Sequence, residues 1–230
     1  MNIHRLYSFF GSRFRARRME AFAQTLQPSD DSTILDIGGY PGTWSHFPRK
    51  PSIVTLNLHG VDFVQTADFP PIQTAIGDGC RLGYADASFD IVFSNSVIEH
   101  LSSFERQKAF ANEARRVGRS LWIQTPAKEF FFEPHLLTPF IHFLPVSFQR
   151  RLIRRFTTWG IVTRPSPAEV ESFLEEVRLL SFAEIQQLFP DCKIQRETVL
   201  GLTKSYIAIR EGAPDRNRRK DDGPIKTGAR

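Results

Sequence analysis

The pattern of apolar positions along the chain predicts short strands that alternate with helices. The first strand is expected at residues 33–38, a brief apolar run that ends in glycines. Similar β-rich runs, each bounded by turn residues, recur at 53–58, 72–76, 89–94 and 120–124. Such runs are typical of buried parallel strands. Two more strands, at 192–199 and 203–209, flank Gly201 and are expected to form a hairpin, which makes the last strand antiparallel.

Helical spacing is found before the first strand and between the later ones. A helix is expected through residues 3–26. Another is expected to begin at Ser102, because Glu105 stands three residues later as in a capping box, and to end near Val117. The same start signal recurs at Ser166 and Ser181.

This alternation favours an α/β fold. We expect a seven-stranded, mostly parallel sheet with the last strand antiparallel, helices on both faces, and a helical insert after the fifth strand. Residues 1–30 are expected to form a basic helical extension and 31–210 the domain, with the insert at 126–180. Residues 211–230 carry many charges and almost no large apolar side chain, which predicts a disordered tail.

Composition excludes several classes of protein. The 230 residues are 41% hydrophobic and 24% charged, with only 14 glycines and 15 prolines, so neither a disordered nor a collagen-like chain is expected. Cys80 and Cys192 lie far apart with no metal-ligand spacing, which argues against a disulfide framework or a structural zinc site. No apolar run is long enough to span a bilayer and no secretory signal is present, so we expect a cytoplasmic protein.

The net charge of +5 is concentrated at the start of the chain. Residues 1–19 contain five arginines and no acidic residue, so the remainder balances at 25 basic against 25 acidic residues. A nucleic-acid partner is therefore not expected for the body. The basic segment is interpreted as a solvated helix face, as a contact for anionic lipid because Phe9, Phe10 and Phe14 interleave with the arginines, or as a transit peptide.

Candidate chemistry gathers where the predicted strands end. The first strand carries Asp36 and runs into a turn that contains Gly38, Gly39, Tyr40 and Gly42. Glycines let the backbone turn sharply and approach a ligand, and Asp36 can hold a cationic group or a bound water. Because position 40 is Tyr, the nicotinamide-binding G-x-G-x-x-G pattern is absent.

The same turn matches the pattern D-x-G-x-G-x-G at Asp36, Gly38 and Gly42, with Tyr40 in place of the middle glycine. Together with residues 85–101, it resembles the class I S-adenosylmethionine-dependent methyltransferases, in particular the small-molecule branch called type 11. The resemblance extends over residues 33–209. It implies a Rossmann-like sheet, S-adenosyl-L-methionine as cofactor, and methyl transfer by in-line displacement.

The resemblance also implies roles for the ends of the next strands. Asn57 stands where the family has an acid that holds the ribose hydroxyls, and Asp78 where a carboxylate accepts from the adenine amine beside a backbone N–H. Asn lacks the charged acceptors of a carboxylate, which puts the affinity for the cofactor in question. The cofactor-binding residues implied are Asp36, Gly38, Gly39, Tyr40, Gly42, Asn57, Asp78, Gly79, Cys80, Ser94 and Asn95.

A general base is needed only if the acceptor must lose a proton. His100, which follows the fourth strand, is the first candidate, although it can equally be a helix-start histidine that satisfies a neighbour. Glu133 and His135, on either side of a proline, are the second. Metal-dependent ubiquinone-type O-methyltransferases carry Glu-x-x-Glu-His here, and Ser96 stands where their first Glu belongs, so no metal ion is expected.

The insert suggests where the acceptor binds. Its six phenylalanines between Phe130 and Phe148 are expected either to line an apolar cavity or to form the core of a helical cap. Four arginines, at positions 150, 151, 154 and 155, follow them. With the basic N-terminal helix they suggest contact with an anionic membrane surface.

The expected function is methylation, preferably at oxygen, of a small or lipid-linked acceptor. Two alternatives stay open. One is a degenerate cofactor-binding module without turnover, suggested by Tyr40 and Asn57. The other is a nucleic-acid-binding protein that acts through its arginines, which a salt-dependent affinity for RNA or DNA that survives deletion of residues 1–19 would support.

Overall fold

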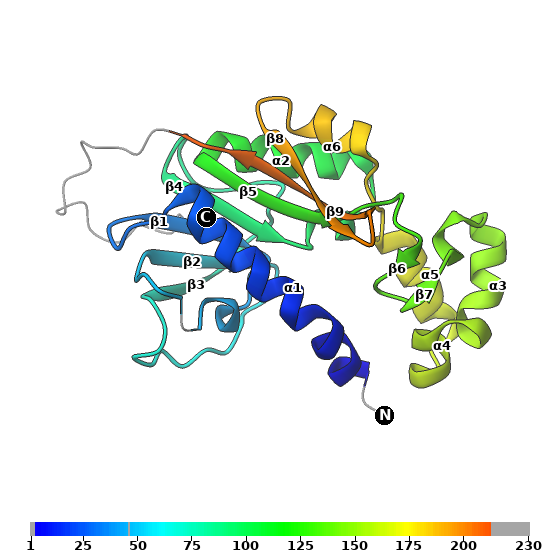
Figure 1. The fold of residues 1–230 in the computed structure, drawn as a ribbon. Helices are drawn as coiled ribbons and strands as arrows, with labels where there is room; N and C mark the ends of the chain where they lie inside the picture. The colour runs from blue at the N-terminus through cyan, green and yellow to red at the C-terminus, as the bar shows by residue number, and fades with distance from the viewer. Residues whose placement is uncertain (1–2, 46, 213–230) are drawn as a thin grey trace.

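The fold is built on one seven-stranded sheet (Figure 1). The computed structural model describes residues 3–45 and 47–212, and the side chains from residue 14 onward. The strand order is β3-β2-β1-β4-β5-β9-β8. The strands are β1 (Thr33–Ile37), β2 (Ser52–Asn57), β3 (Ile72–Ile76), β4 (Phe89–Asn95), β5 (Gly118–Pro126), β8 (Lys193–Val199) and β9 (Leu202–Arg210).

Pairing within the sheet confirms the predicted fold class. β1 pairs in parallel with β2 and β4, β2 with β3, and β4 with β5. β9 is antiparallel to both of its neighbours, β5 and β8. Every strand of this sheet begins and ends within two residues of its predicted position.

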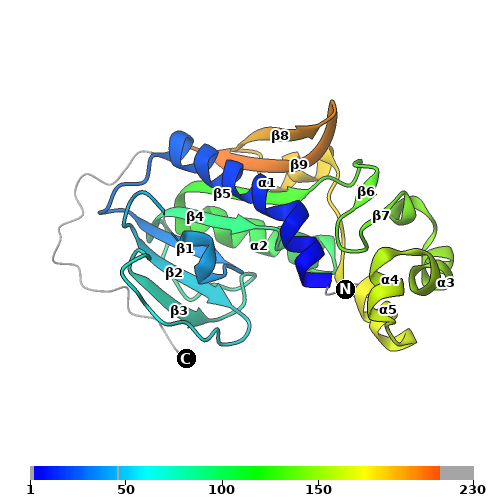
Figure 2. The same ribbon diagram turned by 60° about the horizontal axis from the view of Figure 1, so that its bottom comes forward.

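Helices cover both faces of the sheet, as predicted (Figures 1 and 2). On one face, α2 (Phe104–Val117) and α6 (Phe182–Leu188) pack over a core that includes Leu35 and Ile37 of β1. On the other face, the long α1 (Ile3–Leu26) and the 3-10 turn η1 (Pro41–Trp44) cover a core that includes Ile34. Because successive side chains of a strand point to opposite faces, β1 contributes apolar side chains to the cores on both faces of the sheet.

The second face is covered mainly from the N-terminus of the chain. The connection from β1 to β2 contains only η1, and the described connection from β2 to β3 contains no helix. Phe22 of α1 fills this space, with its ring centroid 5.9 Å from that of Trp44 and 5.1 Å from that of Phe93. The predicted N-terminal extension is thus part of the hydrophobic core of the domain.

One helix start differs from the prediction. Ser103, not Ser102, is the N-cap of α2, and its hydroxyl accepts a hydrogen bond from the backbone N–H of Arg106. Ser102 instead has a positive φ of 56°, which is incompatible with a capping position. The capping boxes at Ser166 and Ser181 are both formed as predicted.

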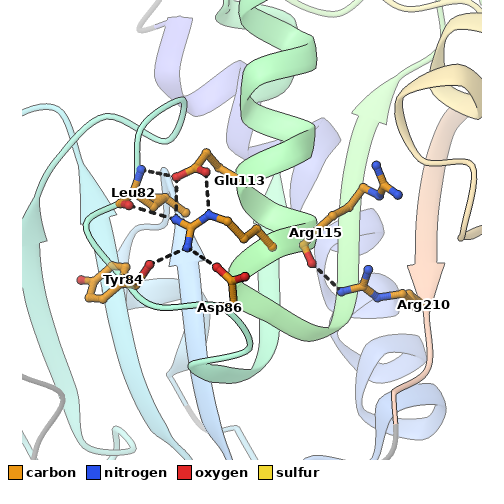
Figure 3. A network of polar contacts seen from close by, with 7 residues as sticks. Leu82, Tyr84, Asp86, Glu113, Arg115 and Arg210 are labelled. Atoms are coloured by element: carbon orange, nitrogen blue, oxygen red, sulfur yellow. Dashed lines mark hydrogen bonds and ion pairs between the residues drawn. The ribbon is translucent and has the colours of Figure 1, made fainter.

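A polar network fixes the loop between β3 and β4 (Figure 3). The guanidinium of Arg116, near the end of α2, donates to the backbone oxygens of Leu82 and Tyr84 and to the carboxylates of Asp86 and Glu113. Glu113 in turn accepts from the backbone N–H of Leu82 at 2.6 Å. This loop follows directly on Asp78, so the network holds that part of the predicted cofactor site against α2.

The insert after β5 forms a small lobe at one end of the molecule (Figure 2). It has a small core of its own, formed by Leu136, Ile141, Ile153 and Val170. No helix of the described chain is long and apolar enough to cross a membrane. The elements of the insert are β6 (Phe132–Glu133), β7 (Thr138–Pro139), η3 (Ile141–Phe143), α3 (Val146–Phe156), α4 (Thr158–Thr163) and α5 (Pro167–Glu176).

The six phenylalanines of the insert do not form the core of a helical cap. Phe140, Phe143 and Phe148 are at least half exposed, and none of the six belongs to the buried core of the lobe. Phe130 packs against the core of the sheet instead. The predicted disordered tail lies almost wholly outside the described residues, as do the side chains of Phe9 and Phe10.

Candidate functional site

The carboxyl ends of β1, β2 and β3 meet at one edge of the sheet, and their tips touch. The side-chain amide of Asn57, at the end of β2, donates a 2.9 Å hydrogen bond to the backbone oxygen of Gly39. After β3, Gly79 approaches β1 so closely that a Cβ there would lie 2.8 Å from Cγ2 of Ile37. Ligands of α/β sheets bind at this edge, and the structure brings together the three segments expected to hold the cofactor.

The turn after β1 requires glycine at two positions. Gly38 has a positive φ of 71°, which side chains rarely adopt, and a Cβ there would lie 2.4 Å from Cγ2 of Val97. A Cβ on Gly39 would lie 1.9 Å from Oδ2 of Asp36. At the exposed end of the same turn, the ring of Tyr40 lies over Gly42. The backbone of this turn is therefore fixed between Asp36 on one side and Val97 on the other.

Asp36 is buried beneath the turn. Its Oδ2 accepts a 2.8 Å hydrogen bond from the indole nitrogen of Trp44, and its Oδ1 has no hydrogen-bond partner among the described residues. Burial raises the pKa of Asp36 to about 7, although the bond from Trp44 opposes this shift. An unpaired buried oxygen is costly and calls for a donor or a cation.

Asp78 lies where it was predicted but is already engaged. Its Oδ1 accepts from the backbone N–H of Cys80 at 2.9 Å, and its Oδ2 accepts from the guanidinium of Arg106 at 3.1 Å. The Cys80 hydrogen bond chiefly lowers the pKa of Asp78, so its carboxylate is charged. The N–H of Cys80 is used within this turn, and burial raises the pKa of the Cys80 thiol to about 11. Asp78 retains lone pairs for a further donor.

Two predicted residues at the end of β4 contact other parts of the chain. Ser94 is fully buried, and its hydroxyl donates to the backbone oxygen of Ile37 at 2.9 Å. Asn95 Oδ1 accepts from the Arg18 guanidinium at 2.6 Å, and Arg18 also pairs with Glu197 of β8. Sequence reasoning did not anticipate that α1 would reach the end of β4. Contact of the predicted residues with the cofactor stays a prediction.

The three candidate catalytic residues come together beside the end of β4. His100 closes the turn η2 (Ile98–His100), and its ring centroid lies 4.9 Å from that of His135, which follows β6. The Nδ1 atom of His135 lies 2.7 Å from Oε1 of Glu133, and Nδ1 of His100 lies 2.9 Å from Oε1 of Glu176. Glu133, two residues before His135, therefore orients one imidazole, and Glu176, from a distant segment, orients the other.

Glu99 is a member of this group that sequence reasoning missed. It is fully buried; its Oε2 accepts from the Thr125 hydroxyl at 3.1 Å, and Oε1 has no hydrogen-bond partner among the residues described. Burial raises the pKa of Glu99, while His100 and His135 lower it. Burial lowers the pKa of His135, but Glu133 and other nearby carboxylates outweigh it and raise that pKa above its usual value.

Two cavities are lined by described residues. A small one of about 180 Å³ is within the insert lobe and is lined by Glu133, Leu136, His142 and Phe173 among others. A larger one of about 860 Å³ lies between α1 and residues 42–49. Only Gly42 of the predicted cofactor residues lines the larger cavity, so its size alone does not make it the cofactor site.

Comparison with known proteins finds a family model that matches part of the chain. Residues 50–120 match the family model of a methyltransferase domain, a span that contains Asn57, Asp78, Glu99 and His100. No curated protein sequence matches the chain.

Solved structures share the fold at low identity. The PH0226 protein from Pyrococcus horikoshii is 13% identical, with a TM-score of 0.53 over 88% of this chain and 92% of that one. The magnesium protoporphyrin IX methyltransferase of Synechocystis, solved with bound SAH, is also 13% identical, with a TM-score of 0.52 over 92% of this chain and 89% of that one. At such identity these two structures support the fold.

Proposed function

We propose that the chain is a class I S-adenosylmethionine-dependent methyltransferase that methylates a hydroxyl oxygen of a small or lipid-linked acceptor taken from an anionic membrane surface. The observation that carries the choice of oxygen is the group of two histidines and a buried glutamate beside the end of β4. Histidine and glutamate side chains can take the proton that a hydroxyl must lose when its oxygen is methylated. An acceptor that has no proton to lose needs no such base.

S-adenosylmethionine is the cofactor, and it supplies a methyl group on a positively charged sulfur. The residues at the sheet edge fit it. The unpaired Oδ1 of Asp36 lies beneath the glycine turn and is suited to a cationic amino group or its bound water. Asn57 uses its amide N–H₂ on Gly39, so its Oδ1 is the atom that accepts from a ribose hydroxyl. Asp78 is charged and partly exposed, as an adenine amine requires.

The candidate catalytic group lies close to this cofactor turn. Val97 packs directly on Gly38, and Glu99 and His100 follow two and three residues later. A neutral hydroxyl must lose its proton as its oxygen attacks the methyl carbon, and an imidazole of this group can receive that proton. The protein otherwise aligns the two reactants and excludes water.

The insert lobe supports a membrane-bound source for the acceptor. Seven large apolar side chains within one stretch of the insert are exposed: Phe140, Phe143, Leu144, Val146, Phe148, Phe156 and Ile161. Exposed apolar side chains gathered in this way mark interaction sites. We call them the apolar patch of the insert.

The charges around this patch support an anionic lipid surface as its occupant. Arg151, Arg154 and Arg155 of α3 and Arg164 after α4 are exposed beside it, and Arg150 is paired with Glu171. Arginines that flank exposed phenylalanines on a short helix are typical of segments that lie in the membrane interface. The backbone of α1, whose first turns belong to the basic segment, contacts α4 in the same region (Figure 2).

The transfer reaction is tested with methyl-labelled S-adenosylmethionine and a cell extract fractionated into lipid and water-soluble material. Replacing His135 by Gln should lower transfer by about 100-fold or more, with unchanged affinity for S-adenosylhomocysteine. The exposed His59 provides the matched control, and His59→Gln should leave both quantities unchanged. Binding of S-adenosylhomocysteine without transfer to any fraction would favour a module that binds the cofactor without turnover.

The membrane contact is tested by sedimentation with vesicles that contain phosphatidylglycerol. The double variant Phe143→Ser/Phe148→Ser and the triple variant Arg151→Gln/Arg154→Gln/Arg155→Gln should each lose vesicle binding. Replacing three exposed basic residues elsewhere, Arg49, Arg81 and Lys108, by Gln is the charge-matched control. Unchanged sedimentation of both patch variants would contradict the proposal.

A further inference from the structure

Glu99, His100 and His135 offer three ligand atoms to one point in space. One side-chain ligand atom from each residue lies within 4.8 Å of those of the other two. Glu99 and His100 are neighbours in η2, whereas His135 follows β6 in the insert, 35 residues further along the chain. The juxtaposition is therefore made by the tertiary fold and not by a local sequence motif.

The two imidazoles are held in the manner of metal ligands. Nδ1 of His135 is bonded to Glu133, which is itself only 2% exposed and also accepts from the backbone N–H of Leu136. Nδ1 of His100 is bonded to Glu176, at the end of α5. In its neutral form, each ring donates from Nδ1 to its carboxylate and carries its lone pair on Nε2. A carboxylate behind each histidine is the usual outer partner in protein metal sites.

The buried carboxylate of Glu99 is a second indication of a bound cation, independent of the histidines. Its side chain is fully buried, yet Oε1 has no hydrogen-bond partner within the described part of the chain. Its other oxygen is held by Thr125, which fixes the direction of the carboxylate. An unpaired buried carboxylate oxygen is expensive unless a cation or a proton meets it.

We propose that Glu99, His100 and His135 together bind a divalent transition-metal cation. Two nitrogens and one carboxylate oxygen suit Zn²⁺, Mn²⁺ or Fe²⁺ better than Mg²⁺ or Ca²⁺, which prefer oxygen ligands. This departs from the expectation of no metal, which rested on Ser96. In the folded chain His135, from a distant segment, provides the third ligand that position 96 does not.

The catalytic role of this cation rests on the proposed function, whereas its binding by the three residues does not. Three protein ligands leave at least one coordination position open, as in catalytic zinc sites. An acceptor hydroxyl that occupied this position would be made more acidic by the charge of the cation. Its proton would pass to solvent, its oxygen would form the bond to the methyl carbon, and the electron pair of the broken carbon–sulfur bond would stay on sulfur. The histidines would then act as ligands and not as free bases.

Metal content tests the inference without any acceptor. The full chain, prepared without a polyhistidine tag and stripped with a chelator, should bind one Zn²⁺ or Co²⁺ per chain in calorimetry, and Co²⁺ should give visible absorption bands. His135→Gln and Glu99→Gln should lose these bands and stoichiometric binding. Glu133→Gln, which removes only the partner of His135, should weaken affinity by about 10- to 100-fold. His59→Gln should bind metal as the wild type does.

A second measurement distinguishes a misfolded variant from loss of the metal site, and the metal site from the proposed function. Each variant is checked for its circular dichroism spectrum and for its affinity for S-adenosylhomocysteine, which the cluster variants should retain. Loss of metal with both quantities unchanged supports the site. Absence of stoichiometric binding by the wild type, or binding that His135→Gln leaves intact, would overturn the metal site even if methyl transfer is found. Metal binding by a chain that does not bind S-adenosylhomocysteine would instead overturn the proposed function alone.

Discussion

The side-chain amide of Asn57 donates a 2.9 Å hydrogen bond to the backbone oxygen of Gly39, which joins the tip of β2 to the turn after β1. This contact explains how an asparagine can serve where the resembling family has an acid. A carboxylate at position 57 would have no proton to donate and would face the Gly39 oxygen with a like partial charge. The amide instead stabilises the turn and keeps one acceptor atom.

Asn57→Ala should therefore weaken cofactor binding without unfolding the protein. Loss of the hydrogen bond to the ribose removes about 1 kcal/mol of binding free energy, so the dissociation constant for S-adenosylhomocysteine should rise about fivefold. Loss of the hydrogen bond to Gly39 should lower the free energy of unfolding by about 1 kcal/mol. Isothermal calorimetry measures this change. Asn112→Ala, at an exposed position on α2, is the control and should leave the affinity unchanged.

Gly39→Ala should be strongly destabilising. The new Cβ would fall 1.9 Å from Oδ2 of Asp36, a buried side chain that is held by Trp44 and cannot move aside freely. A cost of about 1 to 3 kcal/mol is expected from such overpacking, measured by denaturant unfolding. A Cβ added at Gly60 would have Cδ1 of Ile76 as its nearest neighbour, at 3.8 Å, so Gly60→Ala should be nearly neutral. Equal effects at the two positions would contradict the close approach at Gly39.

The buried Asp36 should make stability depend on pH. Its folded-state pKa of about 7 lies above the ordinary value of 3.8, so the folded chain holds this proton more tightly than the unfolded chain. The resulting stabilisation is fully present below about pH 4 and is lost as the pH rises to about 7. Asp36→Asn has no proton to lose. Its stability relative to wild type should rise between pH 4 and pH 8 by an amount on the order of 4 kcal/mol. A constant difference, measured by urea unfolding across this range, would contradict the burial of an unpaired carboxyl.

Even the conservative replacement of Arg116 by Lys should destabilise the protein. Its guanidinium donates to two backbone oxygens and two carboxylates at once (Figure 3), a geometry that an ammonium cannot reproduce. Arg116→Lys should cost about 1 to 3 kcal/mol, because the oxygens of Leu82 and Tyr84 lose their partner. Arg115→Lys, which disturbs a single side-chain pair with Asp191, should cost less. Thermal unfolding of the two variants compares them directly.

Much of the fold could be predicted from the sequence, because strands leave a local signal. The apolar runs and their bounding turn residues placed every strand of the main sheet, and the hairpin around Gly201 placed the antiparallel pair. The capping boxes at Ser166 and Ser181 could also be predicted, because each depends on residues only three positions apart in the sequence. The start of α2 was misplaced by one residue because Ser102 and Ser103 both qualify as caps, and only the backbone conformation separates them.

The parts that could not be predicted depend on contacts between distant segments. Nothing near Asp36 indicates that Trp44 bonds to it, or that Arg18 of α1 reaches Asn95. The phenylalanines of the insert were expected to line an apolar cavity or to form the core of a helical cap, and the exposure of Phe140 follows from the tertiary arrangement of the lobe. Glu99 was overlooked beside its neighbour His100 because its burial and its meeting with His135 arise only on folding.

A crystal structure of the chain with S-adenosylhomocysteine would test the proposed cofactor site most directly. We expect the adenosyl group to lie at the carboxyl edge of the sheet, with its ribose at Asn57, its adenine at Asp78 and its amino group above Asp36. The cavity of about 860 Å³ between α1 and residues 42–49 provides the alternative location. An adenosyl group bound in that cavity, with Asn57 and Asp78 untouched, would contradict the account.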